Sequence, residues 1–172
     1  MLPELPWFMP GFRDTKRMNP LFFIQPSSED VERALESWAW LPIRGKTPIA
    51  VSAFGDVFFE DDEGCWFLDS LDGKLDRICD TRAELVGMLS SEEGENQFLL
   101  AGFVEMAQMN GMAPREGECY DFKVNPILGG PMEFENVTTM NFVVALNLAG
   151  QIHQQVKDLP PGTKISQIKV AS

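Results

Sequence analysis

The sequence is poor in histidine, cysteine and basic residues. Only one histidine, His153, is available to serve a Ser-His-Asp or Cys-His arrangement, and the residue spacing suggests neither. The three cysteines, Cys65, Cys79 and Cys119, are widely spaced and form no CxxC pair. Because structural zinc sites need clustered cysteine or histidine pairs, we expect no metal site and free thiols in a reducing compartment. This predicts a cytoplasmic location.

Long apolar runs are also missing. No window approaches about 18 consecutive apolar residues, so we expect no transmembrane helix. The first ten residues are apolar but contain three prolines and an early glutamate, unlike a signal peptide. We therefore expect neither a membrane partner nor a secretion signal.

Negative charge dominates the composition. The 26 Asp and Glu residues outnumber the 14 Lys and Arg residues, which gives a formal net charge of -12. Such a chain repels phosphate groups, so we expect no direct binding of nucleic acid or of anionic membranes. The charge would attract a basic protein surface, although solubility alone also explains an acidic composition.

Length and apolar content suit one domain with a small appendage. The chain has 172 residues, of which 44% are hydrophobic. Residues 1–26 are rich in proline and predict an irregular arm that lays Leu5, Trp7, Phe8 and Phe12 on the body, with a short strand at residues 21–24. Residues 27–172 predict a single α+β domain.

Four short segments separated by turn residues predict strands at residues 48–54, 56–60, 64–69 and 74–79. Gaps this short are typical of an antiparallel meander. In the segment 64–69, apolar residues occupy the positions of both strand faces, so we expect this strand to be covered on both faces. The predicted fold class is therefore α+β, a mainly antiparallel sheet with helices packed against it.

Capping residues predict the helices. Ser27 begins a helix that ends near Trp40, and Thr81 with Glu84 forms a capping box for a helix reaching about Leu89. A longer helix is expected from Ser91, with a buried face extending to Met109 and a cap at Gly111. A strand is predicted at residues 119–124. The next helix is predicted from an apolar stripe at every fourth position, which consists of Met140, Val144, Leu148, Ile152 and Val156. Pro160, Pro161 and Gly162 end this helix, and a final strand is predicted at residues 165–170.

A search for catalytic or cofactor chemistry finds weak signals only. We expect His153 to be a helix-surface or half-buried histidine rather than a general base. The pair Gly129 and Gly130 lacks the lysine and longer glycine pattern of a phosphate loop. Residues 61–64 lack the alternating ligands of a calcium loop. We therefore predict no cofactor and no enzymatic activity.

What remains is a surface that could bind another protein. If the turns of the meander gather at one end, their acids form a rim beside aromatic side chains, as in many protein-binding sites. Phe58 and Trp66 are more simply explained as core residues. The predicted partner-binding residues are Asp56, Phe59, Glu60, Asp61, Asp62, Glu63, Asp69 and Asp72.

Several short segments resemble the type VI secretion immunity family, in which a GAD-like N-terminal part precedes a C-terminal immunity domain. The resemblance spans roughly residues 20–170, and residues 27–45 resemble only the end of the GAD-like part. It is carried by residues 54–59 (Phe-Gly-Asp-Val-Phe-Phe), 66–73 (Trp-Phe-Leu-Asp-Ser-Leu-Asp-Gly), 119–123 (Cys-Tyr-Asp-Phe-Lys), 126–130 (Pro-Ile-Leu-Gly-Gly), 150–155 (Gly-Gln-Ile-His-Gln-Gln) and 159–162 (Leu-Pro-Pro-Gly).

The resemblance implies a protein that binds and neutralises a cognate secreted toxin, which in several members is a DNase, and it implies no catalytic residue. A nuclease binds phosphates in a basic cleft, which an acidic inhibitor could occupy. Two alternatives stay open: a protein-interaction or regulatory domain without a toxin partner, and a hydrolase with an unrecognised carboxylate site. Rescue of cells that express the toxin would favour toxin neutralisation over both alternatives.

Overall fold

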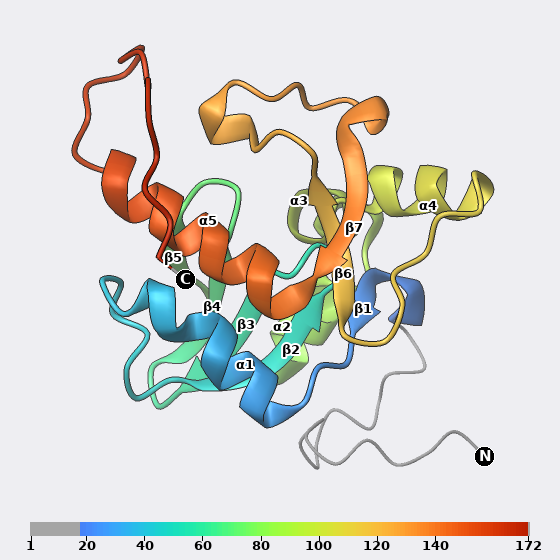
Figure 1. Cartoon of the computed structure of the whole chain (residues 1–172). Coiled ribbons are helices and arrows are strands. Elements are labelled where there is room, and N and C mark those ends of the chain that lie inside the picture. Colours follow the sequence, from blue (N-terminus) through green and yellow to red (C-terminus); the bar gives the residue numbers. More distant parts are fainter. Residues whose placement is uncertain (1–17, 172) are drawn as a thin grey trace.

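The computed structural model describes residues 18–171, which form two antiparallel sheets and the helices around them (Figure 1). The predictions for Leu5, Trp7, Phe8 and Phe12 lie outside the described residues. The larger sheet has five strands in sequence order, so each strand pairs with the next along the chain. These strands are β1 (Phe23–Ile24), β2 (Thr47–Ser52), β3 (Val57–Asp61), β4 (Gly64–Asp69) and β5 (Lys74–Cys79).

The predicted meander is confirmed, and the bounds of β4 and β5 agree with the prediction to the residue. The turn between β3 and β4 explains why local sequence was sufficient. The Asp61 carboxylate accepts the backbone N–H groups of Glu63 and Gly64 at 3.0 and 3.2 Å. Gly64 has a φ of 140°, which a residue with a side chain rarely adopts.

The sheet is covered on both faces. Since side chains alternate along a strand, Phe58 and Phe67 point into one hydrophobic core, and Phe59 and Leu68 point into another. The first core is shared with α2 (Arg82–Met88), α3 (Glu92–Leu99), α4 (Ala101–Met109), β6 (Glu118–Phe122) and β7 (Val137–Asn141). The second is closed by α1 (Ser28–Leu35), the 3-10 turn η3 (Glu36–Trp38) and α5 (Phe142–Val156).

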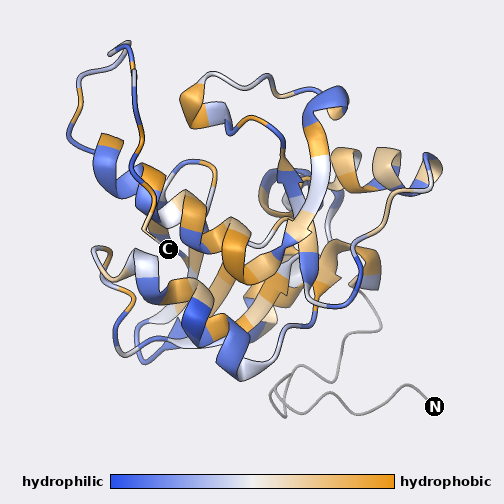
Figure 2. Ribbon diagram, in the orientation of Figure 1, coloured by the Kyte–Doolittle hydropathy of each residue, from blue (hydrophilic) through white to orange (hydrophobic). Residues whose placement is uncertain are grey.

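Figure 1 shows α1 and α5 lying together over one face of the sheet, and Figure 2 shows that much of α5 is apolar. The predicted α+β class and the two-sided burial of residues 64–69 are both confirmed. The smaller sheet pairs β6 with β7. The sequence predicted β6 but not β7.

The predicted caps are confirmed. The Ser27 hydroxyl accepts the Asp30 N–H at 3.1 Å and begins α1. At α2, the Thr81 hydroxyl accepts the Glu84 N–H, and the Glu84 carboxylate accepts the Thr81 N–H. Each cap satisfies backbone donors that the first helical turn leaves unpaired.

The single helix predicted from Ser91 to Met109 is wrong. Leu100 has a φ of 50°, in the left-handed region, and divides the segment into α3 and α4. This break lets Phe98 and Leu99 of α3, and Val104 of α4, all face the same core. The predicted cap at Gly111 is confirmed by its φ of 70°.

The predicted apolar stripe of α5 is also wrong. Of its members in the helix, only Ile152 is buried, and Val144 is exposed. A helix has 3.6 residues per turn, so positions spaced by four drift around its surface. The buried face mixes spacings of three and four and consists of Phe142, Ala145, Leu146, Ala149, Gly150, Ile152 and His153.

The strand predicted at residues 165–170 is absent, because this segment has no regular secondary structure. Its backbone groups bond to side chains of α5 instead of to another strand. Gln155 accepts the Lys169 N–H at 3.0 Å and donates to the Lys169 carbonyl oxygen at 2.7 Å. At the other end of the chain, the strand predicted at residues 21–24 is only β1, since Pro20–Phe22 forms a 3-10 turn, η2.

Candidate functional site

The predicted partner-binding residues do not form one rim. In an antiparallel meander successive turns lie at opposite ends of the sheet. The β3–β4 turn carries Asp61, Asp62 and Glu63 at one end, whereas Asp56, Asp69 and Asp72 lie in or beside the turns at the other end. Two separate acidic groups therefore replace the single rim that the sequence suggested.

Two of the predicted residues are buried. The Phe59 side chain is only 1% exposed and packs in the core beneath α1 and α5. Asp56 is 3% exposed, and its carboxylate accepts the Ser70 N–H at 2.9 Å and the hydroxyls of Ser70 and Ser52 at 2.7 and 2.9 Å. In this structure neither side chain can touch a partner. Burial, with a smaller effect of the nearby Asp69 carboxylate, raises the pKa of Asp56 to about 6.

Asp61 holds the β3–β4 turn together. Besides the two turn N–H groups, its carboxylate accepts the Trp66 indole N–H at 2.8 Å and the Lys46 ammonium at 2.5 Å. The Lys46 Nζ also lies 3.5 Å from the centroid of the Trp66 ring. The hydrogen bond from Lys46 is the main cause that lowers the pKa of Asp61 to about 2. Asp61 is therefore ionised at neutral pH and engaged within the fold.

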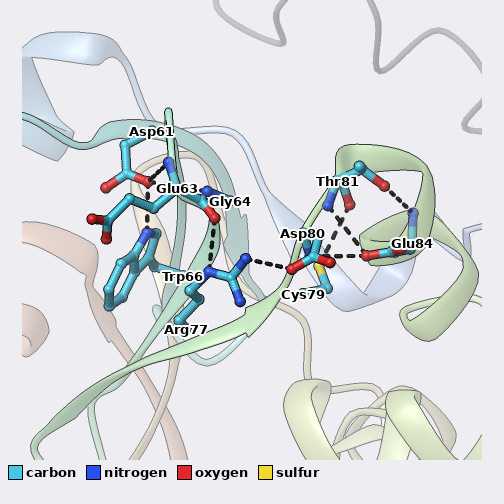
Figure 3. Close-up of polar contacts among 9 residues, drawn as sticks. All are labelled: Asp61, Glu63, Gly64, Trp66, Arg77, Cys79, Asp80, Thr81 and Glu84. Atoms are coloured by element: carbon cyan, nitrogen blue, oxygen red, sulfur yellow. Dashed lines mark hydrogen bonds and ion pairs between the residues drawn. The ribbon is translucent and has the colours of Figure 1, made fainter.

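The neighbouring turn residues are linked to the start of α2 (Figure 3). The Arg77 Nε donates to the Glu63 carbonyl oxygen at 2.7 Å, and the same guanidinium pairs with the Asp80 carboxylate. The Glu84 carboxylate accepts the Asp80 N–H at 2.8 Å. The Arg77 side chain thus joins the β3–β4 turn to the β5–α2 junction. Because it bonds to the Glu63 carbonyl oxygen, the exposed Glu63 carboxylate is left to face solvent.

The structure thus gathers exposed carboxylates from two parts of the sequence at this end of the sheet. We call Asp62, Glu63, Asp80 and Glu84, all of which are exposed, the acidic end. Glu60 lies nearby but pairs with Arg82 at 2.5 Å. Sequence reasoning missed Asp80 and Glu84. The predicted strands contained the necessary signal, because the register that sets Cys65 opposite Cys79 brings residue 80 beside the β3–β4 turn.

The second acidic group lies on the β4–β5 turn. Asp69 accepts the N–H groups of Leu71 and Asp72, both at 2.9 Å, and burial raises its pKa. Only Asp72 is exposed, and its carboxylate lies 3.1 Å from the Lys74 ammonium. This group therefore offers a partner less free charge than the acidic end.

His153 is more deeply buried than predicted. Its Nε2 lies 2.9 Å from the Ser70 carbonyl oxygen, and burial lowers its pKa.

Within residues 18–171, no group of three or more His, Cys, Asp or Glu side chains could hold a metal ion. In the same part of the chain, the helices are too short or too polar to cross a membrane. The three cysteines are free thiols. The exposed functional groups of the acidic end are carboxylates, which suit the binding of a basic surface.

Comparison with known proteins gives a family match and structural matches. Residues 80–153 match the family described as T6SS immunity protein Tdi1, C-terminal, which confirms the resemblance to type VI secretion immunity proteins. No curated protein matches the chain. The crystal structure of Atu4351 from Agrobacterium tumefaciens matches at 19% identity with a TM-score of 0.48, over 75% of this chain. The match spans 65% of that protein's length.

Proposed function

We propose that this chain, which carries a type VI secretion immunity domain in residues 80–153, neutralises its cognate toxin by binding it directly in the cytoplasm. The toxin is proposed to be a nuclease. The family match supports the immunity role, and the observation that supports the class of toxin is the acidic end. Asp62 and Glu63 from the larger sheet meet Asp80 and Glu84 from the segment that matches the family.

Electrostatics connects this surface to a nuclease. A nuclease cleft holds phosphates with clustered Lys and Arg side chains. An inhibitor with a net charge of -12 experiences a long-range attraction to such a cleft, which speeds encounter. The Arg77 and Asp61 contacts fix the backbone of the turn that carries these carboxylates, so little loop order needs to be gained on binding.

The proposal distinguishes contact residues from supporting residues. Asp62 and Glu63 are exposed and are the proposed contacts within the predicted set. Asp61 supports the turn through its bonds to Lys46 and Trp66. Asp80, before α2, and Glu84, in its first turn, extend the contact surface. Asp72 belongs to the other end of the sheet and is proposed only as a secondary contact.

The first test is biological and biochemical together. The proposal expects a toxin gene beside this chain's gene. Its product is expressed in cells with and without the chain, and the purified pair is examined for complex formation. The proposal expects survival only with the chain, a stable complex, and inhibition of DNA cleavage. Absence of both protection and binding would overturn it and favour an interaction domain without a toxin partner. Hydrolysis by the chain itself, abolished by one carboxylate change, would favour the hydrolase interpretation.

The second test concerns the acidic end. The charge reversal Asp62→Lys with Glu63→Lys is compared with Glu32→Lys and Glu36→Lys, which change the same charge at exposed positions of α1 and η3. The association rate with the toxin should fall by about tenfold or more only for the first pair, with a weaker dependence on salt. Equal effects of the two pairs would attribute the rate to net charge and would contradict this surface.

A further inference from the structure

The loop between β6 and β7 exposes several apolar side chains close together in sequence. Val124 is 50% exposed, Ile127 40%, Leu128 38% and Met132 48%. We call these residues the apolar loop. Ile127 and Leu128 lie in the 3-10 turn η4 (Pro126–Leu128), which Figure 2 shows as an orange turn standing above the body of the protein. A single exposed apolar residue is ordinary, but a group of four on one loop is typical of an interaction site.

The apolar loop is held in shape by a buried asparagine. The Asn136 side chain accepts the Val124 N–H at 3.0 Å and donates to the carbonyl oxygens of Val124 and Pro131, both at 2.9 Å. A second asparagine, Asn125, accepts the Ile127 N–H at 3.0 Å. Gly130 approaches the Val124 carbonyl so closely that a Cβ would overlap it. A loop fixed in this way loses little conformational freedom on binding.

Acidic side chains surround the apolar loop. Glu133 and Glu135 are exposed on the loop itself, and Asp121 is half-buried at its start. The base of the loop at Asn125 lines the same small crevice as Leu71, so the β4–β5 turn with Asp72 lies next to it. Lys123 carries a positive charge on the same loop, and its ammonium donates to the Glu135 carbonyl oxygen at 2.6 Å. The surroundings of the loop are therefore negatively charged.

These charges indicate what covers the loop. In a two-fold dimer formed through it, the acids of one copy would face the same acids of the other, which disfavours self-association. A surface with an apolar hollow bordered by Lys or Arg side chains would satisfy both the apolar tip and its acidic border. The proposed toxin would supply the basic part of such a surface, because a nuclease carries clustered Lys and Arg side chains.

We infer that the apolar loop is the anchor by which this chain holds the toxin, inserting Val124, Ile127, Leu128 and Met132 into an apolar hollow with a basic border. This inference rests on the proposed function. The acidic end and the apolar loop then have different roles. Long-range charge at the acidic end sets the association rate, whereas desolvated apolar contact at the loop sets the dissociation rate.

The test replaces the two most exposed members, as Val124→Ser with Met132→Ser. A matched control makes the same chemical changes at exposed positions of other elements, as Val144→Ser on α5 and Met109→Ser on α4, which are 54% and 79% exposed. Binding to the purified toxin encoded beside the gene is followed in real time. The loop pair should raise the dissociation rate by about tenfold or more and leave the association rate within about twofold, while the control pair changes neither.

Thermal unfolding of each variant establishes that both pairs remain folded, and Ile127→Ser with Leu128→Ser provides a second test of the loop. Equal dissociation rates for the loop pair and the wild type would overturn the inference while the proposed function stands. A wild type that fails to bind the toxin at all would overturn the proposed function and the inference with it. A wild-type dimer that becomes monomeric in the loop pair, with unchanged toxin dissociation, would assign the loop to a second copy of this chain and overturn the inference.

Discussion

His153 Nε2 lies 2.9 Å from the carbonyl oxygen of Ser70, a residue 83 positions earlier in the chain. A carbonyl oxygen only accepts hydrogen bonds, so Nε2 carries the proton. Ser70 also donates its N–H and its hydroxyl to the Asp56 carboxylate. The β4–β5 turn is thereby fastened to α5 on one side and to the start of β3 on the other. The only histidine of the chain acts here as a structural link.

Gly73→Ala should destabilise the protein through this link. Gly73 has a φ of 66°, and an added Cβ would overlap the His153 imidazole. Gly45→Ala is the matched control, because Gly45 has a φ of 84° and nothing lies within 4 Å of an added Cβ. Both variants bear the strain of a left-handed residue, about 1 kcal/mol, but Gly73→Ala should lose about 1–3 kcal/mol more from overpacking. Urea denaturation measures both, and equal losses would contradict the contact.

Asp56 should make stability depend on pH in an unusual direction. Its pKa is raised from 3.8 to about 6 in the folded protein, so the folded state holds this proton more tightly than the unfolded state. Its contribution to stability is fully present below pH 3.8 and is lost as the pH rises through about 6. A shift of this size corresponds to about 3 kcal/mol.

The variant Asp56→Asn isolates this effect. The free energy of unfolding of the wild type, minus that of Asp56→Asn, should fall by about 2 kcal/mol between pH 4 and pH 7. Taking the difference removes the contribution of His153, whose lowered pKa acts in the opposite sense. A difference that stays constant over this range would show that Asp56 is not desolvated in solution.

Asn136→Ala should loosen the apolar loop. The change removes hydrogen bonds to the Val124 N–H and to two carbonyl oxygens from a buried site, and we expect a loss of about 2–3 kcal/mol. Asn96→Ala is the control, because the exposed Asn96 side chain bonds only to the Glu92 carbonyl of its own helix. Hydrogen exchange of the Val124 amide should accelerate in the first variant alone. Unchanged exchange there would mean that Asn136 does not order the loop.

Thr81→Ala should weaken the start of α2, because the Thr81 hydroxyl accepts the Glu84 N–H. The expected loss is about 1 kcal/mol in denaturant unfolding. Glu84→Gln keeps an acceptor for the Asp80 and Thr81 N–H groups and should cost less. A larger loss for Glu84→Gln than for Thr81→Ala would indicate that the carboxylate charge, and not the hydroxyl, dominates this cap.

Local signals explain how much of the fold could be predicted. The Asp61 turn and the Thr81 cap depend on hydrogen bonds between residues two to four apart, so their sequence patterns are sufficient. The break at Leu100 depends on a core that receives both α3 and α4, and helical propensity does not reveal it. The buried face of α5 is likewise set by its contacts with α1, η3 and the sheet.

By itself, the sequence determined the α+β class, the order of the meander, the caps of α1 and α2, and the family resemblance, because each depends on residues near one another in the chain. Only the tertiary structure decided which of the predicted residues reach the surface. Burial takes Asp56 and Phe59 out of reach, whereas the separation of Asp72 from Glu63 and the position of Asp80 beside the β3–β4 turn already follow from the meander and its register. Whether a side chain is exposed depends on contacts between segments far apart in the chain, so it follows from packing and not from spacing along the chain.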